Sequence, residues 1–164
     1  MSDDTSLPSL AVLLVDDEAP ARERLRDLLG DLGDKQPTRI VGMASNGVEA
    51  LAVLEATPVD LVITDIRMPV MDGVELARHL ARLAQPPAVI FSTAYDEYAV
   101  RAFELAAVDY LLKPVRAARL ADALTKARRL RPQADEKLRR MAPAARSHFS
   151  ISERGRILLR SEER

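Results

Sequence analysis

Five polar side chains stand where apolar runs of this chain end: Asp16, Asp17, Asp65, Thr93 and Lys113. If those runs are neighbouring parallel strands, their carboxyl ends share one edge of a sheet and the five side chains meet there. Clustered carboxylates repel one another and raise one another's pKa, which favours a hard divalent cation such as Mg²⁺. With a lysine and a hydroxyl, such a cluster has the groups that phosphoryl transfer to a carboxylate requires.

Asp65 taken alone has a simpler interpretation. Many Asp residues that follow strands serve only as caps of turns or helices. The segment from Leu61 to Thr64 is an apolar run that ends abruptly on Asp65, and Asp72-Gly73 follows as a second turn signal. Asp72 can cap the next helix, and the other strand ends give Asp65 two acidic neighbours, a lysine and a hydroxyl, which make Asp65 a candidate site residue.

The elements that must position these residues alternate along the chain. Apolar runs without alternation predict strands buried on both faces, and segments with apolar residues at helical spacing predict helices. The predicted strands are 10–15, 39–44, 61–64, 88–93 and 108–112. The predicted helices are 20–32, 48–54, 74–83, 97–105 and 115–130. This order predicts an α/β fold, a doubly wound five-stranded parallel sheet with five helices, in residues 10–130.

The two ends of the chain lack this pattern. Residues 1–9 are predicted to be a loose N-terminus. Arg131-Pro132 is predicted to interrupt the last helix, so residues 131–147 are interpreted as a linker. Beyond it, Phe149-Ser150-Ile151 alternates as strands do and Arg154-Gly155 can form a turn, so residues 148–164 are interpreted as the truncated start of a second domain.

Composition narrows the class of protein. The chain has no cysteine, which excludes disulfides and thiolate metal sites, and no run of about 18 apolar residues that would suggest a membrane span. A cytoplasmic protein is therefore expected. Residues 1–125 contain 12 Lys and Arg against 20 Asp and Glu, whereas residues 126–164 contain 12 against 5. An acidic body with a basic tail is compatible with an appended nucleic-acid-binding region or with a solvated linker.

In its motifs the chain resembles the receiver domain of two-component response regulators. The resemblance rests on Val15-Asp16-Asp17-Glu18, on Thr64 to Gly73, on Ser92-Thr93-Ala94 and on Lys113-Pro114, each after a predicted strand and in the family's order. It covers roughly residues 9–130 and implies a flavodoxin-like sheet with strand order 2-1-3-4-5.

The resemblance also implies roles for individual residues. Asp65 is the implied phosphoacceptor, which attacks a phosphohistidine of a sensor histidine kinase or a small phosphodonor. Asp17, Asp65 and the backbone carbonyl of Arg67 are implied Mg²⁺ ligands, with Asp16 acting mainly through water.

Three further residues have implied roles in switching. Lys113 pairs with Asp65 before phosphorylation and with the phosphoryl group afterwards. Thr93 closes on a phosphoryl oxygen and draws in Tyr110, which remodels the face built from the fourth helix, fifth strand and fifth helix. The Lys113-Pro114 bond is a candidate cis peptide.

Thr93 to Glu104 and Val108 to Val115 resemble the receivers whose output is a LytTR-type DNA-binding domain, and His148 to Leu159 resembles the opening strands of that domain. The implied partners are a histidine kinase and a second copy of the chain on activation. DNA binding belongs to the part of the output domain missing from this chain, and no membrane partner is expected.

Two other functions remain open at this stage. A phosphohydrolase with an aspartyl-phosphate intermediate uses the same residue types, but position 67 is Arg where such an enzyme needs an acid to protonate its leaving group. A phosphorylation-independent interaction domain predicts no Mg²⁺ affinity. The leading interpretation is a phosphoacceptor that catalyses only its own phosphorylation and dephosphorylation, and is not otherwise an enzyme.

Overall fold

The strand β1 (Leu10–Val15) lies inside the sheet and is buried at all six positions. It pairs in parallel with β2 (Thr38–Ala44) on one side and with β3 (Leu61–Thr64) on the other. Its sequence is uniformly apolar because both of its faces are covered. The predicted bounds of this strand are confirmed.

The remaining strands complete one parallel sheet, in the computed structural model of the chain, which describes residues 7–94 and 105–140. β4 (Ala88–Thr93) pairs with β3, and β5 (Asp109–Leu112) pairs with β4. The order is β2-β1-β3-β4-β5, which confirms the predicted doubly wound α/β fold. All four pairings are parallel, so the carboxyl ends of the strands share one edge.

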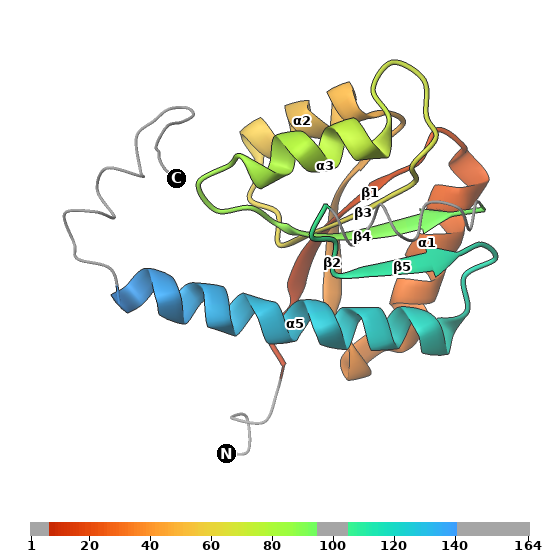
Figure 1. The fold of residues 1–164 in the computed structure, drawn as a ribbon. Helices are drawn as coiled ribbons and strands as arrows, with labels where there is room; N and C mark the ends of the chain where they lie inside the picture. The colour runs from red at the N-terminus through yellow and green to blue at the C-terminus, as the bar shows by residue number, and fades with distance from the viewer. Residues whose placement is uncertain (1–6, 95–104, 141–164) are drawn as a thin grey trace.

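Helices cover both faces of the sheet (Figure 1). α1 (Ala19–Leu32) and α5 (Ala117–Arg140) lie on one face, while α2 (Gly47–Ala56) and α3 (Gly73–Ala81) lie on the other. A single 3-10 turn, η2 (Gly33–Lys35), connects α1 to β2. Four of the five predicted helices are thereby confirmed, and the predicted helix 97–105 falls, apart from its last residue, outside the described residues.

Two hydrophobic clusters fill the space between the sheet and its helical layers. Leu10, Val12 and Leu14 of β1 face α1 and α5, where Leu25 and Leu124 are among their buried companions. The alternate residues of β1 face α2 and α3, in a cluster that includes Phe91 and Leu76. Alternation within each strand therefore divides one apolar sequence between two cores.

Side chains cap the two helices of the second layer. Asn46 accepts a hydrogen bond from the backbone N–H of Glu49 at the start of α2, and Asp72 forms a reciprocal capping box with Glu75 at the start of α3. The predicted capping function of Asp72 is confirmed. The predicted helix 74–83 extends two residues too far, because α3 ends at Ala81, and Leu83 beyond it is 38% exposed.

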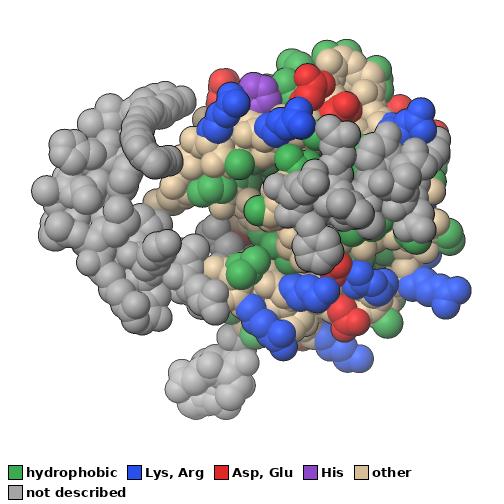
Figure 2. All heavy atoms as spheres, viewed as in Figure 1, with side chains coloured by type: hydrophobic (Ala, Val, Ile, Leu, Met, Phe, Trp, Pro, Cys, Tyr) green, Lys and Arg blue, Asp and Glu red, His purple; other side chains and the backbone are tan. Residues whose placement is uncertain are grey.

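The helix α5 runs on through Pro132 to Arg140, so the predicted interruption at Arg131-Pro132 is wrong. A proline removes one N–H from the helical ladder but does not forbid the helix, and the residues around Pro132 are mostly strong helix formers. Lys and Arg side chains gather over the part of the surface that α5 occupies (Figure 2). The basic character predicted for the end of the chain therefore begins on this helix.

The predictions for the chain ends lie largely outside the described residues. Residues 7–9 have no regular structure, while residues 1–6 and the candidate hairpin in 148–164 are not described. Within the described parts, no helix is both long enough and apolar enough to cross a membrane.

Candidate functional site

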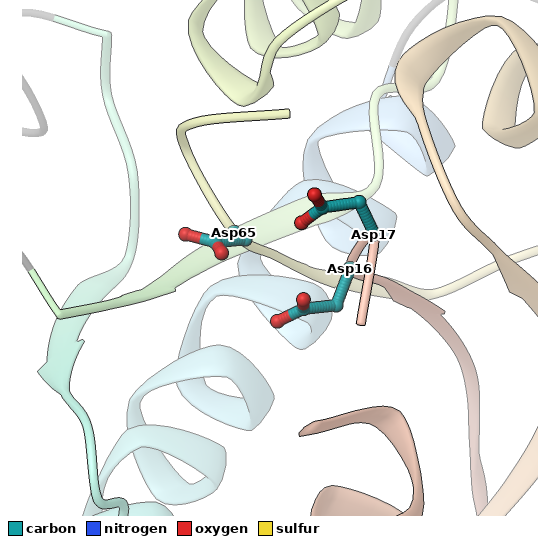
Figure 3. Close-up of side chains that lie close together, drawn as sticks. All are labelled: Asp16, Asp17 and Asp65. Carbon is teal, nitrogen blue, oxygen red and sulfur yellow. The ribbon is translucent and has the colours of Figure 1, made fainter. Parts of the chain in front are cut away.

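Three carboxylates meet at the carboxyl edge of the sheet, as the sequence predicted. Asp16 and Asp17 follow β1, Asp65 follows β3, and one carboxylate oxygen from each lies within 4.8 Å of the others (Figure 3). Asp16 and Asp65 are buried, whereas Asp17 is exposed. The cluster thus consists of two buried carboxylates and one solvent-exposed carboxylate.

Asp16 is held by neighbours on both of its carboxylate oxygens. Its Oδ1 accepts a hydrogen bond from the backbone N–H of Glu18 at 3.0 Å, and its Oδ2 accepts one from Lys113 Nζ at 2.7 Å. Burial raises the pKa of the Asp16 carboxyl above its usual value and outweighs the opposing effect of Lys113. Ionised Asp16 is therefore costly here unless further positive charge is supplied.

Lys113 is the cation that links two of the three carboxylates. Its Nζ lies 2.7 Å from Asp16 Oδ2 and 3.1 Å from Asp65 Oδ2. Burial alone would lower the pKa of Lys113, but the hydrogen bond to Asp16 and the two negative charges raise it overall. The expected pairing of Lys113 with Asp65 is confirmed, whereas its pairing with Asp16 was not predicted. The Lys113-Pro114 peptide bond is cis, as predicted.

Asp65 is fixed in place by its backbone and by its side chain. Its N–H donates to Val15 O at 2.9 Å, which extends the β1–β3 pairing by one residue. Oδ1 accepts a hydrogen bond from the N–H of Ile66 at 2.7 Å, while Oδ2 accepts one from Lys113. These bonds define the orientation of the Asp65 carboxylate, and 9% of the residue is exposed to solvent.

The loop after Asp65 is strained and tightly anchored. Val70 has a φ of 72° and is exposed, and the N–H of Met71 donates to Pro69 O at 2.8 Å, the hydrogen bond of a γ-turn. Met71 packs against Gly47, whose N–H donates to Met71 O at 2.9 Å. A strained β-branched residue persists only where its surroundings hold it, and here they include the start of α2.

Gly73 packs directly against the backbone of Asp65. Its N–H donates to Ile66 O at 2.8 Å, and a Cβ at this position would lie 2.1 Å from the carbonyl oxygen of Asp65. Real Cβ atoms never approach a backbone oxygen so closely, so glycine is required here. The start of α3 and the proposed nucleophile are therefore positioned together.

The other residues predicted for the site lie at or near the same edge. Thr93 closes β4, is fully buried, and accepts a hydrogen bond from the N–H of Lys113 on its backbone oxygen at 2.9 Å. Tyr110 in β5 is partly buried against the cluster that contains Phe91. Arg67 is exposed in the loop after Asp65. The switching and metal-binding roles assigned to these three stay predictions.

The donor set suits a hard divalent cation. Three carboxylates face a single lysine at this edge, so the described site carries surplus negative charge, and burial already disfavours ionised Asp16. Oxygen ligands of this kind match Mg²⁺, which is content with one or two carboxylates and keeps several waters. The residues present therefore fit the ion that the sequence predicted.

Sequence reasoning missed several supporting contacts. Arg22 Nη1 donates to the backbone oxygen of Asp16 at 2.6 Å, which ties α1 to the acidic cluster. Ser92, next to Thr93, projects to the opposite face of β4 and lines a pocket beside Lys113. The sequence signal for Ser92 was a polar residue inside an apolar strand. Its side chain faces the layer opposite to that of Thr93, because successive strand residues point to opposite faces.

Residues 12–125 match the family model for the response regulator receiver domain. With the strand order and the acidic cluster described above, the chain belongs to this family. The resemblance inferred from the sequence motifs is confirmed.

Known proteins similar to this chain include regulators and receiver domains. It is 51% identical over 118 residues to the positive alginate biosynthesis regulatory protein of Pseudomonas aeruginosa, a match that covers 72% of this chain and 47% of that protein. It is 34% identical over 143 residues to the transcriptional regulatory protein LytR of Staphylococcus aureus, covering 87% and 57%. The chain thus spans about half the length of these curated relatives.

Solved structures agree with the fold. The response regulatory domain of protein mrkE from Klebsiella pneumoniae superimposes with a TM-score of 0.67 at 36% identity, covering 76% of this chain and 99% of that domain. The signal receiver domain of the putative response regulator NarL from Mycobacterium tuberculosis gives a TM-score of 0.67 at 26% identity, covering 75% and 98%.

Proposed function

We propose that this domain takes a phosphoryl group onto Asp65 from the phosphohistidine of a sensor histidine kinase. The observation that carries the proposal is the position of the Asp65 carboxylate. It lies beside two other carboxylates and bonds to Lys113 Nζ, with one oxygen fixed by the N–H of Ile66. Catalysis of phosphoryl transfer consists largely of positioning and charge neutralisation, and this site is arranged for both.

The transfer exchanges one bond to phosphorus for another. An oxygen of Asp65 attacks the phosphorus in line, the P–N bond to the histidine breaks, and its electron pair returns to the imidazole nitrogen. Hydrolysis later returns the carboxylate when water attacks the acyl phosphate and inorganic phosphate leaves. Mg²⁺ bound by Asp17, Asp65 and the carbonyl of Arg67, with Asp16 acting through water, would neutralise charge on the phosphoryl oxygens.

Lys113 and Thr93 are proposed to respond to the new phosphoryl group. Lys113 already carries a raised pKa and so stays charged when it exchanges the Asp65 carboxylate for a phosphoryl oxygen. Thr93 is the last residue of β4, at the same edge, and its backbone oxygen accepts a hydrogen bond from the N–H of Lys113, so its hydroxyl is a candidate donor to a second phosphoryl oxygen. Tyr110, partly buried on the next strand, would change its packing as Thr93 moves.

The output is proposed to be control of transcription through a LytTR-type DNA-binding domain in a longer protein. The similarity to a transcriptional regulator named LytR supports this, as does the fact that the chain matches only 57% of that protein's length. Phosphorylation would remodel the face that includes β5 and α5 and favour a homodimer. The proposed location is the cytoplasm, and DNA is contacted only through the output domain.

Mass spectrometry after incubation with acetyl phosphate or phosphoramidate and Mg²⁺ tests the acceptor. We expect one added phosphoryl group on the wild-type chain and none on Asp65→Asn. The matched control is Asp34→Asn, which replaces an exposed carboxylate in η2 and should be labelled like the wild type. Labelling of Asp65→Asn at the wild-type level would overturn the assignment.

Turnover and metal affinity separate the remaining functions. We propose that the domain catalyses only its own phosphorylation and dephosphorylation, so phosphomonoesters should give no multiple turnover. A phosphohydrolase would release many equivalents of phosphate under the same conditions. A phosphorylation-independent interaction domain would show no Mg²⁺-dependent rise in thermal stability.

A further inference from the structure

Arg22, near the start of α1, bonds to the backbone of the acidic cluster. Its Nη1 donates a hydrogen bond to the backbone oxygen of Asp16 at 2.6 Å. The N–H of Asp16 donates to Ala44 O at 3.0 Å, so both backbone groups of this residue are bonded to other elements. A hydrogen bond from a charged donor is stronger than one between neutral groups. Arg22 therefore helps to fix the chain where β1 passes into α1.

The oxygen that Arg22 contacts belongs to the peptide group between Asp16 and Asp17. A peptide group is planar, so fixing this oxygen also fixes the direction in which the chain continues to the Cα of Asp17. Within the described parts of the chain, the Asp17 carboxylate has neither a hydrogen-bond nor an ion-pair partner, unlike the carboxylates of Asp16 and Asp65. The place of Asp17 in the cluster (Figure 3) therefore depends on its backbone, which Arg22 holds from one side.

The charge of Arg22 and its hydrogen bond should affect a bound cation in opposite ways. A positive charge beside a Mg²⁺ site repels the ion, so the charge alone would weaken binding. Hydrogen bonds from Ser45 and, less strongly, the charge of Arg22 lower the pKa of Glu49 in α2, so part of this charge is balanced outside the cluster. If the hydrogen bond to Asp16 holds a ligand in place, it strengthens binding. The sign of the change in Mg²⁺ affinity on removal of Arg22 therefore shows which effect is larger.

We propose that Arg22 is a positioning residue for Mg²⁺, a role that rests on the proposed function, in which Asp17 is a ligand of the ion. Arg22 acts through the peptide group between Asp16 and Asp17 and does not touch the metal. Loss of a group that orients a metal ligand typically lowers metal affinity about 10- to 100-fold. Because Arg22 bonds to the backbone beside the ligand and not to its carboxylate, we expect a loss of about tenfold.

Titration of the 164-residue chain with Mg²⁺, followed by heteronuclear NMR, measures this affinity. Arg22→Met keeps a long unbranched side chain but removes the donors and the charge, and its Kd for Mg²⁺ should rise about tenfold. The matched control is Arg26→Met, which removes an exposed arginine one helical turn further along α1. This control should bind Mg²⁺ as tightly as the wild type or slightly more tightly.

The outcomes separate this role from the proposed function. Absence of Mg²⁺ binding in the wild type would overturn both. A wild type that binds Mg²⁺, together with an unchanged or lower Kd in Arg22→Met, would overturn the role of Arg22 alone. Arg22→Lys keeps the charge and one donor on a shorter side chain, so its affinity should lie between those of the wild type and Arg22→Met.

Phosphorylation kinetics distinguish positioning from a general structural role. With acetyl phosphate as the donor, Arg22→Met should need about tenfold more Mg²⁺ for half-maximal labelling, and its rate at saturating Mg²⁺ should stay within about twofold of the wild type. A merely structural contact would lower the melting temperature without changing the Mg²⁺ requirement. That result, or a lower maximal rate with an unchanged Mg²⁺ requirement, would overturn the assignment.

Discussion

The two edges of this sheet carry charge in opposite ways. At the carboxyl edge three carboxylates lie together, only two of them are paired with Lys113, and burial raises the pKa of Asp16. At the amino edge Arg128 of α5 donates to Gln36 Oε1 at 2.7 Å, to Pro37 O at 2.7 Å and to Pro8 O at 2.6 Å. At the carboxyl edge the carboxylates repel one another, whereas at the amino edge the Arg128 guanidinium donates hydrogen bonds to uncharged oxygen atoms.

Further contacts complete the amino edge. Gln36 Nε2 donates to Thr125 Oγ1 at 2.8 Å, so the buried Gln36 side chain is bonded on both its oxygen and its nitrogen. Asp109, the first residue of β5, pairs with Arg119 and Lys126. Burial would raise the pKa of Asp109, but these partners and the N–H of Tyr110 lower it overall. Each of these polar side chains therefore has a hydrogen-bond or ion-pair partner.

The contrast shows where stability and function are located. Polar groups at the amino edge are satisfied, so removing one of them leaves its partners unbonded and destabilises the fold. The carboxyl edge retains repulsion that a cation or a phosphoryl transfer would relieve. Local electrostatic conflict of this kind is typical of functional sites, which the rest of the fold must support.

Gly73→Ala should have the largest effect and should reduce both the stability of the fold and the phosphorylation of Asp65. The new Cβ would lie 2.1 Å from the backbone oxygen of Asp65, which cannot move without shifting the nucleophile. We expect a loss of about 3 kcal/mol of unfolding free energy and loss of labelling by acetyl phosphate. Urea denaturation and mass spectrometry measure the two quantities.

Gly30→Ala is the matched control, because nothing lies within 4 Å of a Cβ at that position in α1. It should stabilise the protein by up to about 1 kcal/mol through helix propensity. If Gly73→Ala unfolded and labelled like the wild type, the close contact with Asp65 would have no energetic significance.

Arg128→Ala should destabilise the fold by about 2 kcal/mol, since it leaves Gln36 and two backbone oxygens without this donor. Mg²⁺ affinity should not change, because the residue lies at the opposite edge. Urea denaturation and a Mg²⁺ titration provide the measurements. Arg129→Ala, its exposed neighbour, should stay near the wild type. A stability loss of similar size in both variants would show that the network contributes nothing specific.

Asp17→Asn should raise stability in the absence of metal by about 1 kcal/mol, the Coulomb energy of two charges a few ångströms apart in water. Asp17 supplies the exposed oxygen of the cluster, so the same change should abolish most of the Mg²⁺-dependent rise in melting temperature. Thermal denaturation with and without Mg²⁺ measures both effects. A full Mg²⁺ response in this variant, with Asp34→Asn as control, would exclude Asp17 as a ligand.

The smallest effect concerns pH at the amino edge. The pKa of Asp109 is lower in the folded protein than in the unfolded chain, so its pairing stabilises the fold above the unfolded value and is lost as pH falls through the folded value. The contribution should be below about 1 kcal/mol, because Arg119 and Lys126 are about half exposed. Denaturation of wild type and Asp109→Asn should differ at pH 7 and converge as pH falls through the folded pKa of Asp109, where protonation removes the charge.

The sequence specified most of the architecture through local patterns. Unbroken apolar runs located the strands, and β1 and β4 have the predicted bounds. Asp72 was identified as a helix cap because it stands directly before apolar residues at helical spacing, and the structure adds Glu75 as its reciprocal partner. The extension of α5 through Pro132 was missed, since one proline changes a local preference without deciding the fate of a long helix.

At the candidate site, the sequence determined which residue types arrive at one edge, because parallel strands bring their carboxyl ends together whatever their spacing in the chain. Only the tertiary structure decided that Lys113 lies closer to Asp16 than to Asp65, that Gly73 packs on the Asp65 backbone, and that Ser92 faces a pocket. It also decided the pairing of Arg128 with Gln36, which are 92 positions apart. Such contacts depend on distances between side chains from different elements, which packing of the two layers fixes and local sequence patterns do not encode.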